Sequence, residues 1–177
     1  MAALLCPRLV GREAERAQLD AVAEAALRGV GRAVVVSGEA GTGKPALVRA
    51  ALPADRTVVA GGGPAALAEW VVALVERGAD PSRLEAHRAV LAAVAPGLLG
   101  PTAAGDAPHP VVIGDAIVRL WATLPVPRRP VLLFEDAHWA DEVTGEVLRR
   151  VAERGPAAGV PVVITARPDG PRLPGLR

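Results

Sequence analysis

Two patterns of apolar positions alternate along the chain. Short runs of consecutive apolar residues predict strands at 33–36, 57–60, 131–136 and 160–165, and runs of this kind are typical of strands covered on both faces. Between them, apolar residues recur every three or four positions, which indicates helices with one buried face. The expected helical segments are 19–27, 46–52, 65–77, 83–94, 110–124 and the stretch after 141. Strands that alternate with helices predict an α/β fold, with a parallel sheet between two layers of helices.

Capping and turn residues mark the expected ends of these elements. Gly29 is placed to end the first helix, Pro110 suits the first turn of a helix, and Asp141 can cap the helix that follows it. The segment 96–110 is rich in Pro, Gly and Ala and is expected to be a mobile loop, and the prolines at 125–130 are expected to exclude regular structure there. The expected inner faces are Leu19, Val22, Ala23, Ala26 and Leu27 in the first helix, and Val143, Val147, Leu148 and Val151 in the last.

Composition narrows the class of protein. The net charge of +1 offers no basic face for nucleic acid, so we expect no direct DNA binding. The single Cys6 excludes an internal disulfide framework and is compatible with a reducing compartment. The N-terminal apolar run lacks the basic residues of a signal peptide, and no apolar stretch reaches the roughly 20 residues of a bilayer span. We therefore expect a cytoplasmic protein without membrane contact.

The strand at 33–36 leads into a candidate phosphate-binding loop. Gly38, Gly43 and Lys44 satisfy the P-loop pattern G-x-x-x-x-G-K, and the residues between them are Glu39, Ala40, Gly41 and Thr42. Glycines let the backbone amides approach an anion, and the next helix directs its positive end toward it. The chain has nineteen arginines and one lysine, and that lysine is Lys44. This choice favours a site where a compact ammonium is needed. A glycine-rich turn without a ligand is the alternative.

Pro45 departs from the P-loop pattern. A Ser or Thr normally follows the lysine and its hydroxyl binds Mg²⁺, whereas proline has neither a hydroxyl nor an N–H. The ring also disfavours helical dihedrals at Lys44. Each lost hydrogen bond to a charged group is worth about 1.5–3 kcal/mol. We therefore expect weakened nucleotide binding and slow or absent hydrolysis.

A second group of candidate residues follows the third strand. Glu135 and Asp136 come at its carboxyl end, as in a Walker B segment, where one carboxylate serves Mg²⁺ and another polarises the attacking water. A solvated strand end is the alternative. His138 and Trp139 are expected to pack the following turn, with contact between His138 and the substrate as the second possibility. His87 and His109 stand alone, and no Cys or His grouping has metal-ligand spacing.

These segments together resemble a known family. The stretches 9–13 (LVGRE), 37–44 (SGEAGTGK), 134–142 (FEDAHWADE) and 164–169 (ITARPD) are similar to the ATPase region of LuxR-type transcriptional regulators, in the signal-transducing STAND branch of the AAA+ superfamily. The resemblance covers nearly the whole chain and implies a P-loop NTPase fold that uses ATP and Mg²⁺. It places Val10, Gly11 and Arg12 near the adenine and residues 38–45 at the phosphates. It assigns Glu135 and Asp136 to Mg²⁺ and water, and Arg167 to sensing the terminal phosphate; a surface arginine is the alternative.

The resemblance also implies parts that this sequence does not contain. Relatives have a fifth strand, a lid subdomain and a helix-turn-helix, so residues 1–177 are expected to be an incomplete ATPase domain. In the family's topology the strand at 33–36 lies beside the sensor strand, and without a fifth strand residues 34–36 would form an uncovered sheet edge.

Three functions remain open from the sequence. The first is an ATP-binding switch in a signalling protein, whose nucleotide state governs protein contacts or self-association. The second is a degenerate P-loop remnant that serves as an interaction module without useful nucleotide affinity. A small-molecule kinase is the third and least supported, since nothing resembles an acceptor site.

Overall fold

The sheet has four parallel strands in the order β1-β4-β3-β2. The computed structural model describes residues 11–63, 65–100 and 107–168. The strands are β1 (Ala33–Ser37), β2 (Thr57–Ala60), β3 (Val131–Phe134) and β4 (Val162–Ala166). The α-helices are α1 (Glu13–Leu27), α2 (Lys44–Ala51), α3 (Ala66–Glu76), α4 (Glu85–Val94), α5 (Pro96–Leu99), α6 (Pro110–Ala122) and α7 (Glu142–Arg154). The predicted α/β fold is therefore confirmed.

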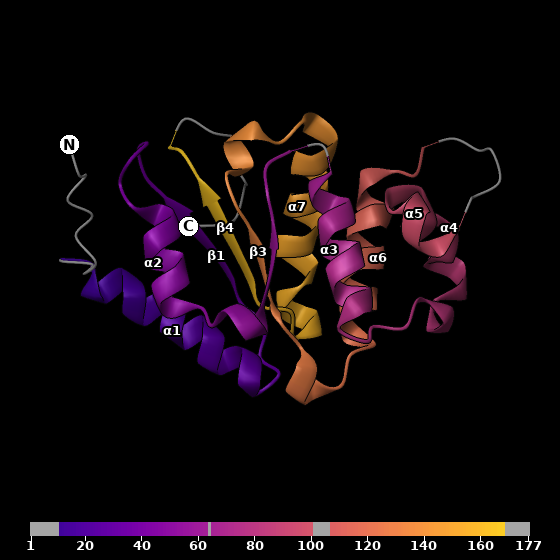
Figure 1. Ribbon diagram of the computed structural model, residues 1–177, viewed down its shortest axis with the longest axis horizontal. Helices are drawn as coiled ribbons and strands as arrows, with labels where there is room; N and C mark the ends of the chain where they lie inside the picture. Colours follow the sequence, from indigo (N-terminus) through magenta and orange to yellow (C-terminus); the bar gives the residue numbers. More distant parts are fainter. Residues whose placement is uncertain (1–10, 64, 101–106, 169–177) are drawn as a thin grey trace, which may run out of the picture.

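Helices cover both faces of the sheet, as Figure 1 shows. Successive residues of a strand point to opposite faces, and in β3 they enter two separate cores. Val131 and Leu133 pack against α1 and α2, whereas Leu132 and Phe134 pack against α3, α6 and α7. Trp70 of α3 meets Phe134 edge to face at 5.6 Å and donates its indole N–H to the Leu133 carbonyl. The unbroken apolar runs in the sequence follow from this burial on both faces.

The helices α4 and α5 extend the larger core away from the sheet. They lie beyond α6 in Figure 1, and Leu91 of α4 is fully buried in the same cluster as α6. The expected loop at 96–110 is thus partly wrong, because residues 96–99 form α5; residues 101–106 lie outside the described residues. The segment 126–128, expected to be irregular, is a single 3-10 turn that leads into β3.

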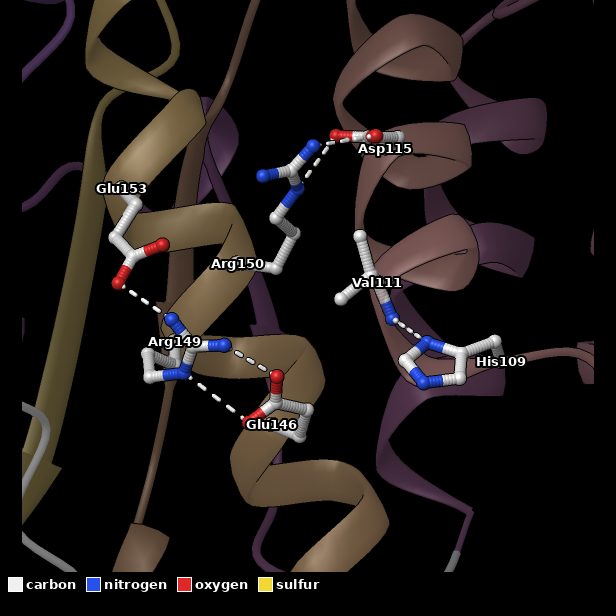
Figure 2. A network of polar contacts seen from close by, with 7 residues as sticks. All are labelled: His109, Val111, Asp115, Glu146, Arg149, Arg150 and Glu153. Atoms are coloured by element: carbon white, nitrogen blue, oxygen red, sulfur yellow. Dashed lines mark hydrogen bonds and ion pairs between the residues drawn. The ribbon is translucent and has the colours of Figure 1, made fainter.

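The contact between α6 and α7 combines close backbone approach with ion pairing. Arg150 donates from Nε and Nη2 to the two carboxylate oxygens of Asp115, at 2.9 and 2.8 Å, which joins the helices (Figure 2). This pair holds the pKa of Asp115 below its usual value. Along α7, Arg149 bridges Glu146 and Glu153. The Arg150–Asp115 pair therefore ties α7 to α6, whereas the Arg149 pairs lie within α7 itself.

Two expected inner positions are wrong. Leu27 ends α1 with 55% of its surface exposed, and Val143 in the first turn of α7 is 50% exposed. Both lie in the terminal turn of a helix, where helical spacing alone does not decide whether a residue is covered. The Asp141 cap is confirmed, since its carboxylate accepts the Thr144 N–H at 2.7 Å. In the described part of the chain, no helix is long and apolar enough to cross a membrane.

Candidate nucleotide site

The parallel sheet brings the predicted motifs to one edge. β1 ends at Ser37 before the P-loop, β3 ends at Phe134 before the acidic pair, and β4 ends at Ala166 before Arg167. Because β4 pairs with both β1 and β3 in parallel, these three ends are neighbours. The edge position of β1 also agrees with the topology that the resemblance implied: among the described residues, β1 pairs with β4 alone. Loops at the carboxyl ends of parallel strands are where α/β proteins bind ligands.

The P-loop folds around the ammonium of Lys44. Lys44 is only 5% exposed, and its Nζ donates to the carbonyls of Gly38 at 2.6 Å and Glu39 at 3.0 Å. An ammonium has three N–H donors, so one remains for a ligand. Gly41 and Gly43 have φ values of +77° and +80°, a conformation that side chains with a Cβ rarely adopt. The backbone therefore needs glycine at these two places in the motif.

Pro45 is accommodated at the start of α2. The helix begins at Lys44, with Gly43 as its N-cap residue, so Pro45 is the second residue of the first turn. The expectation that the ring would keep Lys44 out of the helix is wrong. The first-turn N–H groups have no partner within a helix, which is why proline is tolerated there. Compared with the usual Ser or Thr, Pro45 lacks one backbone N–H and one hydroxyl on the phosphate side of the loop.

The acidic pair is divided by a sharp turn. Glu135 donates its backbone N–H to the Ala60 carbonyl at 2.8 Å and so extends the pairing of β3 with β2. Asp136 then adopts φ 55° and ψ 47°, and is the one non-glycine residue with positive φ among the described residues. The Asp136 backbone N–H donates a hydrogen bond to Thr165 Oγ1 at 2.9 Å. A strained backbone of this kind, which costs on the order of 1–3 kcal/mol, is common at functional sites.

A cavity of about 390 Å³ lies where these segments meet. Its lining consists of residues 40–46 together with Arg49, Asp136, His138, Trp139 and Arg167. The structure thus brings the P-loop, Asp136 and Arg167 together. Gly11, Arg12, Gly38, Glu39 and Glu135 do not line this cavity, and Val10 lies outside the described residues.

Three of the lining side chains were not assigned to the site from the sequence. Arg49 lies one helical turn after Pro45 on α2, so the i, i+4 spacing could have revealed it. Trp139 is 68% exposed, and the Arg167 guanidinium carbon lies 5.7 Å from its ring centroid. His138 packs against Trp139 with ring centroids 5.1 Å apart. The expected packing of this turn against the following helix is wrong for Trp139, whose ring is mostly exposed beside Arg167, and stays a prediction for His138.

The residues of the cavity wall could hold Mg²⁺ only together with the phosphates of a bound nucleotide. Among the described residues, Asp136 is the single carboxylate in the cavity wall, and no group of three or more His, Cys, Asp or Glu side chains could hold a metal. Magnesium usually keeps several waters and binds proteins through one or two carboxylates plus the phosphates of a substrate. One carboxylate beside a phosphate-binding loop fits that pattern, with the hydroxyl ligand missing at position 45.

A glycine loop with a buried lysine between β1 and α2, beside an acidic turn after β3, defines the class of P-loop NTPases. Within that class, residues 8–165 match the family described as AAA ATPase domain, and the chain belongs to it. No curated protein and no solved structure matches the chain.

Proposed function

We propose that this chain binds ATP in the cavity at the ends of β1, β3 and β4 and acts as a nucleotide-dependent switch. The observation that carries the proposal is the convergence of residues 40–45, Asp136 and Arg167 on one cavity from three separate segments. Membership of the AAA ATPase domain family supports nucleotide as the ligand.

Each part of the site has a proposed task. The amides of residues 38–43 and the remaining N–H of Lys44 bind the phosphates, and Arg167 contacts the terminal phosphate. Asp136 holds Mg²⁺, which neutralises charge on the phosphates, and Glu135 orients water. Gly11 and Arg12, which do not line the cavity, are assigned to the adenine together with Val10.

The proposed activity is modest. Pro45 supplies neither a hydroxyl to Mg²⁺ nor an amide to phosphate, so binding is weak and hydrolysis to ADP is slow. Slow ATP hydrolysis suits a switch, in which the bound nucleotide controls protein contacts and does not serve metabolism. By resemblance of the segment 134–142, we place the chain in a cytoplasmic signalling protein of the LuxR-type STAND group, whose switch acts through protein contacts or self-association and not through DNA contacts of this chain.

Calorimetric titration with ATP and with ADP, each with and without Mg²⁺, tests the proposal. We expect binding by the parent chain and its loss in Lys44→Ala, because the ammonium is the buried cation of the loop. Arg56→Ala is the matched control: it also removes one positive charge, but Arg56 is exposed and precedes β2 at the opposite edge of the sheet. Equal binding by Lys44→Ala and Arg56→Ala would refute a working phosphate loop.

A second candidate function is an interaction module without useful nucleotide affinity. Pro45 favours it, and so does the position of the Lys44 ammonium, which already donates to two carbonyls of its own loop. Absence of ATP and ADP binding in a sample that unfolds cooperatively would establish this alternative.

A further inference from the structure

Four arginines from separate parts of the chain line a second cavity, at the opposite end of the sheet from the nucleotide site. The cavity has a volume of about 340 Å³, and its wall consists of Asp55, Arg56, Arg77, Arg128 and Arg129. These residues lie just before β2, at the end of α3 and just before β3, along the lower edge of Figure 1. Because the strands are parallel, this edge holds their amino ends, whereas the nucleotide cavity lies at their carboxyl ends. We call this second cavity the arginine pocket.

Two of the guanidinium groups are held by backbone carbonyls. Arg77 donates to the carbonyls of Asp55 at 2.6 Å and Thr57 at 3.1 Å. Arg129 donates to two carbonyls of the segment 122–124, at 2.9 and 3.1 Å. Since a guanidinium has five N–H donors, each of these two groups keeps three for a ligand. The protein therefore orients two charged forks in advance.

The positive charge of the arginine pocket is not balanced by the protein. Among the described residues, none of the four arginines makes an ion pair, and the one carboxylate in the wall belongs to Asp55. Arg128 is exposed, and its Nη1 lies 3.9 Å from the place that a Cβ at Gly78, next to Arg77, would take. Like charges that are held together repel one another, and a bound anion would offset that repulsion.

We propose that the arginine pocket binds a phosphate group, either as inorganic phosphate or as the monoester of a small molecule. A phosphate monoester carries a charge of about −1.5 to −2 at pH 7 and has three acceptor oxygens. Guanidinium forks bind such oxygens in pairs, and forks that are already oriented lose little freedom on binding.

The charge and the size of the pocket favour this ligand class. The wall has four positive charges and one negative charge, so a dianion complements it better than a single carboxylate does. A volume of about 340 Å³ lies at the lower end of the range of about 300–1,000 Å³ for small-molecule pockets. There is room for a phosphate with a small organic group. The proposal does not depend on the nucleotide site, which the phosphate loop forms elsewhere.

The tryptophans allow phosphate binding to be followed at each site. The sequence has three: Trp121, whose ring centroid lies 4.8 Å from the Arg129 guanidinium carbon, Trp139 in the nucleotide cavity, and Trp70 in the core. In titrations with inorganic phosphate and with glycerol phosphate at constant ionic strength, we expect the Trp121 indole ¹H–¹⁵N resonance to shift and to saturate at about millimolar concentration. The Trp70 resonance should stay in place.

The comparison of anions identifies the ligand. Tighter binding of glycerol phosphate would indicate a monoester as the ligand, and tighter binding of inorganic phosphate would indicate the free ion. A Trp121 response that does not saturate, or that acetate produces equally at the same ionic strength, would overturn the proposal.

Arg128→Ala tests the pocket without disturbing the fold. The Arg128 side chain is exposed and makes no hydrogen bond among the described residues, so we expect the urea midpoint of the parent. Phosphate should bind about tenfold more weakly, because charged hydrogen bonds are lost. Arg128→Lys keeps the charge but not the fork of donors, and should recover only part of the affinity. Arg88→Ala is the matched control, since Arg88 is exposed on α4 and lines neither cavity. Equal phosphate affinity in Arg128→Ala and Arg88→Ala would overturn the proposal.

Lys44→Ala and Arg56→Ala separate the two sites. Lys44 lines only the nucleotide cavity, and Arg56 lines only the arginine pocket. We expect Lys44→Ala to keep the Trp121 response to phosphate, and Arg56→Ala to weaken it while ATP binding at the phosphate loop is retained. Loss of the Trp121 response in Lys44→Ala would place the phosphate in the nucleotide cavity and overturn this inference. Absence of ATP binding together with the expected Trp121 response would refute the proposed function alone.

Discussion

At the scale of single residues, Pro45 decides how well this site can work. The helix α2 starts at Lys44 although Pro45 follows, so proline in place of the usual Ser or Thr does not disturb the helix. The loss is chemical, since the position lines the cavity but presents neither a hydroxyl nor an N–H to it. Lys44 and the glycines with positive φ still form the loop around this position, which lacks the hydroxyl and the N–H.

Pro45→Thr should therefore restore Mg²⁺-dependent ATP binding. Two recovered contacts of about 1.5–3 kcal/mol each correspond to a gain in affinity of about a hundredfold or more. Pro45→Ala separates the two contacts, because alanine restores the N–H alone and should give a smaller gain without added Mg²⁺ dependence. Calorimetric titration of the three chains measures both effects. If Pro45→Thr binds no better than the parent, position 45 does not limit the site.

At the scale of elements, α6 and α7 are held at a distance that only glycine permits. A Cβ at Gly114 of α6 would lie 2.8 Å from Cβ and Cγ of Arg150 and 3.3 Å from the Val147 carbonyl oxygen. The neighbouring Asp115 then reaches the Arg150 guanidinium with both oxygens. The close approach and the ion pair thus depend on the same spacing.

Gly114→Ala should separate these helices and destabilise the domain by about 1–3 kcal/mol, because overpacking outweighs the helix preference of alanine. Gly145→Ala is the matched control on α7, since nothing lies within 4 Å of its added Cβ. That variant should be more stable by roughly 0.5–1 kcal/mol. Urea unfolding followed by circular dichroism measures both. Equal stability changes in the two variants would contradict the close approach of α6 and α7.

At the scale of the whole molecule, several carboxylates link stability to pH. The Arg150 hydrogen bonds lower the pKa of Asp115, and the Thr144 amide at the start of α7 lowers the pKa of Asp141. Because these folded-state pKa values lie below the ordinary value of 3.8, the unfolded chain binds more protons in that range. The stabilisation is present above that value and is lost as the pH falls through the folded-state values.

We expect the urea midpoint to be level near neutral pH and to fall steeply below about pH 4. Asp115→Asn should lower the midpoint at neutral pH and make the fall shallower, because the carboxylate no longer titrates. Glu24→Gln is the control, since Glu24 is exposed and makes no ion pair or hydrogen bond within the described residues. A parent midpoint that rises on acidification, or the same slope in Asp115→Asn, would contradict this assignment.

The sequence by itself determined the order of the elements and the chemistry of the loop. Unbroken apolar runs predicted the buried strands, because a strand covered on both faces needs apolar residues at consecutive positions. The spacing of Gly38, Gly43 and Lys44 predicted the P-loop, and Asp141 predicted the start of α7, because these local motifs carry their own backbone requirements.

Only the tertiary structure decided what each side chain meets. Adjacent positions such as Glu135 and Asp136 look alike in sequence, but the left-handed turn brings Asp136 alone into the cavity wall. Val143 has the spacing of an inner residue, yet half of its surface is exposed. Periodicity reports which face of an element is apolar, whereas burial and hydrogen bonding depend on what packs against it.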